Sequence, residues 1–225
     1  ACLAHDIGNP PFGNSGEDEI GTWFAEKIAA GQGLFSQLPQ GEIMELSKFE
    51  GNAQGFRLIS RIEMYRNEGD MRLSYPVIAA FQKYTARART SYAESRPAYV
   101  GLKKFGVFES EWELFQNVAN KVGLFEETSD HGAWYRRHPL VYLVEAADDI
   151  CYEITDLEDA FVGGVLPYND VVKALKPIAN PNKDTGHLTE EEHVAFLRAK
   201  AIGRLVAACV KAFEDNYSEI VAGTF

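Results

Sequence analysis

Residues 139–161 read PLVYLVEAADDICYEITDLEDAF, and this stretch decides the class of fold. Apolar residues recur in it at steps of three and four, which is the spacing of one buried stripe on an α-helix. They are Leu140, Leu143, Val144, Ala147, Cys151 and Ile154. The proline at the start suits the first turn of a helix, where its missing N–H costs nothing. The stretch therefore predicts a long helix that packs one face against a core.

The same stretch also carries a polar face. Asp148, Tyr152 and Asp156 recur every four residues, so they share one side of the predicted helix. Carboxylates at this spacing repel one another, and a bound divalent cation is one way to compensate them. A solvated acidic face with Tyr152 at its boundary is the other interpretation, and the pattern alone leaves both open.

Helical periodicity recurs along the chain and alternating strand patterns are scarce, so we expect an all-α protein with little or no sheet. A second long helix is predicted from Thr189 to about residue 214, because Thr189 and Glu192 have the spacing of a capping box. Shorter helices are expected at residues 15–30, 52–65, 75–84 and 109–122, with a long loop over 85–100.

Composition limits the class of protein. The 225 residues are 46% hydrophobic, which allows a sizeable core, and the net charge of -11 argues against a generally basic face for nucleic acid. The three cysteines form no CxxC pair, so we expect neither a disulfide framework nor a thiolate zinc site, and a reducing cytoplasmic location. No apolar run approaches the roughly 18 residues that span a bilayer, so no membrane partner is expected. Because the first residue is Ala1, we expect the chain to be the interior of a longer protein.

Residues 1–17, ACLAHDIGNPPFGNSGE, place His5 and Asp6 just before Gly8 and Pro10. A helix that ends at Gly8 and Pro10 would leave this pair in its last turn, where ligand positions on a metal stay open for water and phosphate. A single His-Asp pair is a weak motif, since such a histidine more often forms hydrogen bonds at a helix end. A carboxylate from residues 139–161 meeting the pair would make a metal site.

Five segments in order carry a resemblance to a known family. They are ACLAHDIGNPPFGNSGE (1–17), KFEGNAQGFRLI (48–59), LSYPVIAAFQKY (73–84), KKFGVFESE (103–111) and YLVEAADDICYEITDLEDA (142–160). Together they resemble the deoxyguanosinetriphosphate triphosphohydrolase (dGTPase) family of the HD-domain superfamily, and the resemblance extends to residue 225. It implies an all-helical HD fold around one divalent metal, Mg²⁺ or Mn²⁺, that hydrolyses a deoxynucleoside triphosphate to the deoxynucleoside and inorganic triphosphate. We expect one helical domain over residues 1–225, without the upstream helix that carries the family's first histidine ligand and without a C-terminal portion.

The resemblance assigns the metal ligands and the catalytic positions. His5, Asp6 and Asp148 match the family's His-Asp pair and its late aspartate ligand. The family usually has a histidine eight residues after the aspartate of the pair, acting with a glutamate on water or phosphate, and here these positions are Asn14 and Glu17. Asparagine cannot exchange a proton near neutral pH, so about 10²- to 10⁴-fold of rate is at stake if the histidine transfers one. Nucleotide binding is therefore expected to survive better than turnover.

The resemblance also assigns substrate contacts. Tyr152 and Asp156 match deoxyribose positions, the ring lying where a 2′-hydroxyl would project and the carboxylate accepting from the 3′-hydroxyl. The positions that match the family's triphosphate-holding residues are Asn52, Lys83, Tyr84 and one of Lys103 and Lys104, of which we choose Lys104. The implied substrate is dGTP or another deoxynucleoside triphosphate. Family analogy adds a homo-oligomer, expected to be a hexamer, and single-stranded DNA as a further partner.

Two rival functions stay open. A regulatory module that binds deoxynucleotides without hydrolysing them would carry Asn14 naturally, and restoration of hydrolysis by Asn14→His would distinguish the two. Another HD-type phosphohydrolase, acting on monophosphates or cyclic dinucleotides, would share the metal ligands but not the EGNAQ and QKY segments. The remaining histidines have no ligand spacing and are expected at the surface or at helix ends, with His138 at a helix entry; they are His131, His138, His187 and His193.

Overall fold

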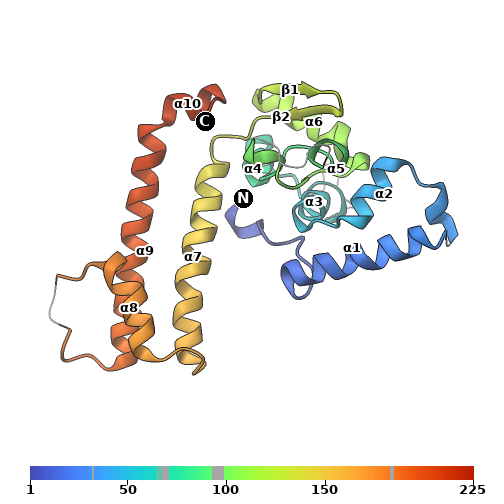
Figure 1. Cartoon of the computed structure of the whole chain (residues 1–225). Coiled ribbons are helices and arrows are strands. Elements are labelled where there is room, and N and C mark those ends of the chain that lie inside the picture. Colours follow the sequence, from blue (N-terminus) through green and yellow to red (C-terminus); the bar gives the residue numbers. More distant parts are fainter. Residues whose placement is uncertain (32, 65, 67–70, 93–98, 183–184) are drawn as a thin grey trace. The chain divides into compact units, whose positions relative to one another are not determined.

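The computed structural model describes residues 1–31, 33–64, 66, 71–92, 99–182 and 185–225, and it is mostly helical (Figure 1). The chain divides into two compact units, Ala1–Val141 and Tyr142–Phe225, here called the first and second units. The predicted all-α class is confirmed, with one small hairpin as the only sheet among the described residues. The expectation of one domain over residues 1–225 stays a prediction.

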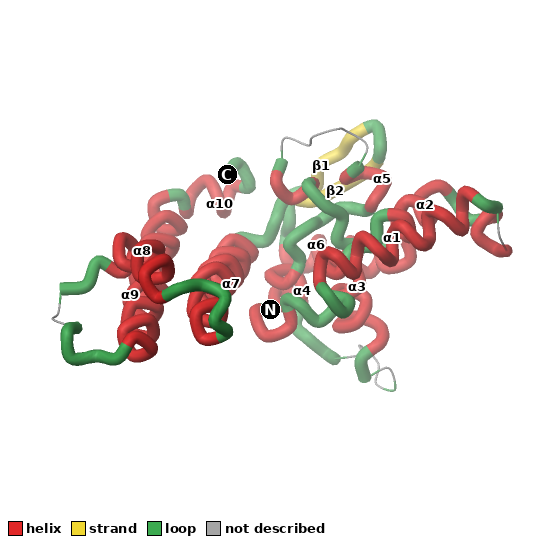
Figure 2. The backbone as a smooth tube through the Cα atoms, turned by 60° about the horizontal axis from the view of Figure 1, so that its bottom comes forward, coloured by secondary structure: helices red, strands yellow, loops and turns green. Residues whose placement is uncertain are grey.

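The first unit contains six α-helices and the hairpin among its described residues. The helices are α1 (Gly13–Ala29), α2 (Gln40–Ser47), α3 (Gly51–Arg57), α4 (Tyr75–Phe81), α5 (Ala88–Ser91) and α6 (Trp112–Val122). Strands β1 (Glu126–Ser129) and β2 (Gly132–Tyr135) pair antiparallel, with Glu126 opposite Tyr135. They are the two yellow strands in Figure 2. Short 3₁₀ turns at Cys2–Ala4, Gly33–Gln37, Val100–Leu102 and Glu109–Glu111 complete the unit, with a π turn at Leu58–Ile62.

An aromatic core holds the first unit together. Phe56 of α3, Phe115 of α6 and Tyr135 of β2 are fully buried. Their rings meet edge to face, with centroids 5.8 Å apart for Phe56 and Phe115 and 5.7 Å for Phe115 and Tyr135. Phe81 at the end of α4 belongs to the same cluster. The core thus fixes α3, which carries most of the EGNAQ segment, and the end of α4, which the QKY segment follows directly.

The second unit is built from long helices with an aliphatic core. It contains nearly all of α7 (Val141–Val162), then α8 (Tyr168–Ala179), α9 (Glu190–Asp215) and α10 (Tyr217–Ala222), and Figure 1 shows α8 packed along α9. Its buried cluster consists of Ile154, Val171, Leu175, Ala179, Val194, Leu197 and Ala201. Thr189 and Glu192 form the predicted capping box, each side chain accepting from the other's backbone N–H. Across the described helices, none combines the length and apolarity needed to cross a bilayer.

The two long predicted helices are confirmed as α7 and α9, and the prediction of residues 15–30 is confirmed as α1. The prediction for residues 75–84 is wrong at its end, because α4 stops at Phe81. Gln82 adopts an extended backbone, and its side chain donates to the carbonyl of Tyr84 at 2.8 Å and to that of Gly106. Lys83 and Tyr84 therefore lie in a loop rather than in a helix.

Other boundaries also differ from the predictions. Residues 52–65 are α-helical only to Arg57 and then form the π turn, and residue 65 lies outside the described residues. The expected loop over 85–100 contains α5, and its residues 93–98 also lie outside them. Helices α2, α8 and α10 were not predicted. In α8 the period was present in Val171, Leu175 and Ala179, but Pro177 lies in its last turn, a position where proline usually indicates that a helix has ended.

Candidate functional site

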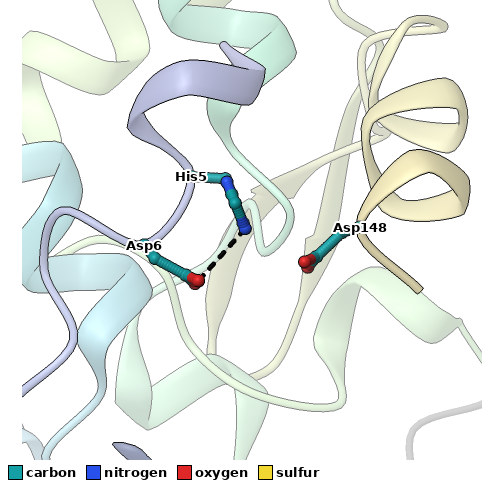
Figure 3. A group of neighbouring side chains, drawn as sticks. All are labelled: His5, Asp6 and Asp148. Atoms are coloured by element: carbon teal, nitrogen blue, oxygen red, sulfur yellow. Dashed lines mark ion pairs between the residues drawn. The ribbon is translucent and has the colours of Figure 1, made fainter. Parts of the chain in front are cut away.

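His5 and Asp6 form an ion pair directly after the 3₁₀ turn Cys2–Ala4 (Figure 3). The Nδ1 atom of His5 lies 2.7 Å from the carbonyl oxygen of Cys2. A carbonyl oxygen can only accept, so Nδ1 carries the hydrogen and donates it. The other ring nitrogen, Nε2, lies 3.1 Å from Asp6 Oδ2. When protonated it donates to this carboxylate in the ion pair, and when deprotonated it has the lone pair that metal binding requires.

Asp6 is oriented in the same way by a neighbour. Asn9 Nδ2 donates to Asp6 Oδ1 at 2.8 Å, while Oδ2 faces His5. A hydrogen bond thus orients each side chain of the pair through one atom, Nδ1 of His5 and Oδ1 of Asp6. The other polar atom of each, Nε2 and Oδ2, faces the partner side chain. A histidine whose second nitrogen is bound to a backbone carbonyl, next to a hydrogen-bonded carboxylate, is the usual arrangement of metal ligands.

Close backbone packing fixes this turn against α3. Gly8 is buried, and a Cβ atom added to it would lie 2.0 Å from the carbonyl oxygen of Gly51 and 2.2 Å from the nitrogen of Gly55. Neither neighbour is a movable side chain, so any larger residue would push the backbones apart. The sequence indicated Gly8 as part of a helix stop, but the structure shows only the short 3₁₀ turn before it and gives Gly8 a packing role.

Two carboxylates and one lysine meet at the start of α3. Glu17 of α1 accepts from the N–H of Gly51 at 2.6 Å through Oε1, and its Oε2 lies 3.3 Å from Lys104 Nζ. Glu50 accepts from Asn52 Nδ2 at 2.7 Å through Oε1, and its Oε2 lies 3.0 Å from the same Nζ. We call Glu17, Glu50, Asn52 and Lys104 the carboxylate–lysine group. It brings together three predicted site residues and adds Glu50.

Burial and the neighbouring charges together shift the pKa values of this group. Glu50 is 2% exposed, and burial raises its pKa, although the hydrogen bond from Asn52 and the charge of Lys104 oppose this. Burial would lower the pKa of Lys104, but the charges of Glu50 and Glu17 outweigh it and raise that pKa above its ordinary value. Burial, followed by the charge of Glu50, raises the pKa of Tyr92 to about 12. Lys104 is therefore a cation at neutral pH.

A cavity of about 440 Å³ lies beside the carboxylate–lysine group. Glu17, Glu50, Lys104, Tyr92 and Lys48 are among the residues that line it. Sequence reasoning missed Glu50, because the residues preferred at an N-cap are Ser, Thr, Asp and Asn, and Gly51 and Asn52 are weak helix formers. In the structure Glu50 nevertheless caps α3 by accepting from the N–H of Asn52.

Lys83 and Tyr84 lie on a segment that adjoins the Lys104 segment. The N–H of Gly106 donates to the carbonyl of Ala86 at 3.0 Å, so the two stretches run together. The carbonyl of Lys83 accepts from Arg137 Nε at 2.8 Å. The predicted triphosphate residues of the first unit thus come from α3 and from two adjoining loops.

Asn14 lies in the first turn of α1, exposed, and one helical turn before Glu17. The pair therefore shares a side of α1. Glu17 is 7% exposed, in contrast to Asn14, and both its oxygens already have partners. In this structure Glu17 joins α1 to α3 and to Lys104.

The residues predicted on the long helix lie on one face of α7. Asp148 is half-buried, and it is drawn with His5 and Asp6 in Figure 3. Tyr152 is 68% exposed and Asp156 is exposed, whereas Ile150 and Ile154 are buried. The predicted apolar stripe is only partly correct: Val144 and Ile154 are buried, whereas Leu140, Ala147 and Cys151 are exposed.

His138 stands at the entry of α7, as predicted. Its carbonyl accepts from the N–H of Val141 at 2.9 Å, and its Nδ1 accepts from the N–H of Leu140 at 3.2 Å. Burial lowers the pKa of His138, which favours the neutral ring that this acceptor role requires. His138 therefore closes the turn that leads into α7.

Comparison with known proteins gives the family. No protein-family model matches the chain. A deoxyguanosinetriphosphate triphosphohydrolase-like protein of Synechocystis is 43% identical over 233 residues, covering 100% of this chain and 51% of the relative. One of the same description from Pseudomonas aeruginosa is 40% identical, covering 99% of this chain and 50% of the relative.

A more distant match carries the unqualified name. The deoxyguanosinetriphosphate triphosphohydrolase of Klebsiella pneumoniae is 30% identical over 270 residues, covering 100% of this chain and 50% of the relative. The chain spans about half the length of the curated relatives it matches. Since the matches extend over the entire chain, it belongs to the family of deoxyguanosinetriphosphate triphosphohydrolase-like proteins.

Proposed function

We propose that the protein containing this chain hydrolyses dGTP, or another deoxynucleoside triphosphate, to the deoxynucleoside and inorganic triphosphate. The observation that carries this proposal is the match along the whole chain to relatives described as dGTP triphosphohydrolase-like. The carboxylate–lysine group supports it, because a cationic lysine and an amide donor are chemically suited to phosphate oxygens. An HD phosphohydrolase for monophosphates or cyclic dinucleotides is less well supported, since the relatives carry neither description.

We propose that His5, Asp6 and Asp148 hold a divalent cation, Mg²⁺ or Mn²⁺, with a further histidine from outside this chain. The donor set fits, because each residue offers an imidazole nitrogen or a carboxylate oxygen. The hydrogen bonds to His5 and Asp6 are those that orient such ligands. When bound, the cation would offset negative charge on the phosphate oxygens.

In this proposal the chain's own residues position the substrate. Lys104, Asn52, Lys83 and Tyr84 hold the triphosphate as charges and hydrogen-bond donors. On α7, Asp156 accepts from the 3′-hydroxyl and the Tyr152 ring occupies the space of a 2′-hydroxyl. A ribonucleotide would then be rejected by crowding and by desolvation of its extra hydroxyl.

Glu17 is proposed to orient the attacking water through residue 14. Water attacks the α-phosphorus, the bond from this phosphorus to the 5′-oxygen breaks, and the deoxynucleoside leaves as its 5′-oxygen takes up a proton released by the water. The water oxygen stays on the triphosphate, which is retained by its cationic and amide partners. Asn14 can orient water by hydrogen bonding but cannot take or give a proton. Binding is therefore expected to be better preserved than turnover. The alternative function, a deoxynucleotide-binding regulatory module, keeps the same contacts without turnover.

The test compares the intact protein with its Asn14→His variant, measuring inorganic triphosphate released from dGTP with Mg²⁺ or Mn²⁺. We expect the variant to be faster by about 10²- to 10⁴-fold, the range of general acid–base catalysis. Ser15→His is the matched control, because Ser15 is the exposed neighbour of Asn14 and its variant adds the same imidazole. It should turn over like the parent.

The outcomes separate the candidates. If Asn14→His raises turnover and Ser15→His does not, the result supports the hydrolase. No turnover in any variant, with dGTP still bound, contradicts it and favours the regulatory module. Failure of all variants to bind dGTP overturns both.

Assembly and partners are proposed on family analogy alone. A homo-oligomer, expected to be a hexamer, would be visible by light scattering of the intact protein. Single-stranded DNA would be detected as a competitor or an activator in the triphosphate assay. The free thiols of Cys2, Cys151 and Cys209 are compatible with the proposed reducing cytoplasm.

A further inference from the structure

Lys104 forms ion pairs with two carboxylates of its own chain. Its Nζ lies 3.0 Å from Glu50 Oε2 and 3.3 Å from Glu17 Oε2. The carboxylates of Glu17 and Glu50 and the ammonium group of Lys104 together carry a net charge of one negative unit. An approaching triphosphate therefore meets a lysine whose charge is more than compensated.

Glu50 competes for both triphosphate donors at once. Besides its contact with Lys104, it accepts from Asn52 Nδ2 at 2.7 Å. Glu17 contacts Lys104 at the longer distance and uses its other oxygen on the backbone of Gly51. Because Glu50 is 2% exposed, water screens its charge poorly.

We propose that Glu50 restrains Lys104 and thereby lowers the affinity of the site for triphosphate groups, including the triphosphate product. This inference rests on the proposed function. Glu50 is a positioning residue, since it acts through Lys104 rather than on the substrate. Its effect favours product release, because Lys104 has carboxylates to return to when the triphosphate leaves.

Glu50→Gln isolates the charge. The glutamine Oε1 can still accept from Asn52 Nδ2 and cap α3, whereas Lys104 loses one of its two carboxylates. Isothermal titration of the intact protein with inorganic triphosphate, at fixed free Mg²⁺, should give a Kd about tenfold lower than the parent's, the effect of one moderately screened charge. The Kd for deoxyguanosine, which has no phosphate, should not change.

Glu45→Gln is the matched control. Glu45 is also a buried glutamate of the first unit, 6% exposed, and accepts from the backbone N–H of Glu109. Burial raises its pKa to about 7, and the charges that act on it are those of Glu109, Arg57 and Glu42. Glu45→Gln should leave the Kd for inorganic triphosphate within about twofold of the parent's, since Glu45 interacts with charges other than that of Lys104.

A gain of affinity for triphosphate alone cannot come from damage to the fold, which would weaken binding. If Glu50→Gln folds, by its thermal transition, and binds triphosphate equally or more weakly, the inference is overturned. The inference is also overturned if the Kd for deoxyguanosine falls by the same factor as the Kd for inorganic triphosphate. If Glu50→Gln does not fold, Glu50→Asp replaces it, keeping the charge one methylene further from Lys104. That variant should tighten triphosphate binding by a smaller factor, and an unchanged Kd overturns the inference.

The parent protein separates this inference from the proposed function. If the parent binds neither dGTP nor inorganic triphosphate, the proposed function fails and the inference fails with it. If the parent binds both and Glu50→Gln does not tighten triphosphate binding, only the inference fails.

Discussion

The acidic residues of the first unit and those of α7 are arranged in opposite ways. Glu17 and Glu50 are nearly buried, and each has both oxygens bound, to Lys104 and to groups at the start of α3. On α7, Tyr152 and Asp156 are exposed. The proposed phosphate-binding residues are therefore held by contacts within the first unit, whereas the proposed sugar-binding residues stand exposed on α7.

The same contrast applies to packing. The first unit brings backbones into direct contact around Gly8, and the second unit joins long helices through aliphatic side chains. Replacing a glycine by a larger residue should therefore be costly where backbones touch, as at Gly8, and mild on the helix faces of the second unit that have open space beside them.

The largest expected loss of stability follows Gly8→Ala. Its Cβ would lie 2.0 Å from the carbonyl oxygen of Gly51, so two backbone segments must separate. We expect the free energy of unfolding to fall by about 3 kcal/mol, at the upper end of the usual cost of overpacking. Urea denaturation of the intact protein measures this.

Gly203→Ala is the counterpart in the second unit. Gly203 lies within α9 with nothing within 4 Å of its added Cβ, so alanine should be neutral or stabilise the helix by up to about 1 kcal/mol. Equal losses from the two substitutions would remove the contrast in packing.

The next effect concerns charge. Lys104→Met leaves Glu17 and Glu50 close together without their shared cation, and should cost about 2 kcal/mol, less than for a fully buried pair because Lys104 is one-third exposed. In the second unit, Arg198 pairs with Glu158 at 2.6 Å near the surface. Arg198→Met should cost less than about 1 kcal/mol, as surface pairs do.

Lys103→Met is the matched control for Lys104→Met. Lys103 is the exposed neighbour of Lys104, and its substitution removes the same charge from the chain. It should change the free energy of unfolding by no more than about 0.5 kcal/mol. If both substitutions lower the free energy of unfolding equally, the ion pairs of the carboxylate–lysine group add nothing to stability.

The predictability of the two regions differs for a physical reason. α7 and α9 were predictable because helical periodicity and the Thr189 capping box are local patterns. The polar face of Asp148, Tyr152 and Asp156 follows from the same period. Their roles, and those of His5 and Asp6, came from family resemblance and stay proposals.

The carboxylate–lysine group could not be assembled from local patterns. Lys104 and Glu17 are 87 positions apart, and their contact depends on how α1, α3 and a loop pack. The end of α4 at Phe81 was missed for the same reason, since Gln82 turns the chain by bonding to distant Gly106. The hairpin was missed because its strands are only four residues long.

The most direct test asks whether the His5–Asp6 pair of the first unit and the α7 residue Asp148 serve one metal-dependent nucleotide site. dGTP binding to the intact protein is titrated with Mn²⁺ for Asp148→Asn and for Asp149→Asn, whose aspartate is the exposed neighbour on the same helix. We expect Asp148→Asn to lose the Mn²⁺-dependent gain in dGTP affinity and Asp149→Asn to keep it. Retention of that gain by Asp148→Asn, or equal loss in both variants, would contradict the account.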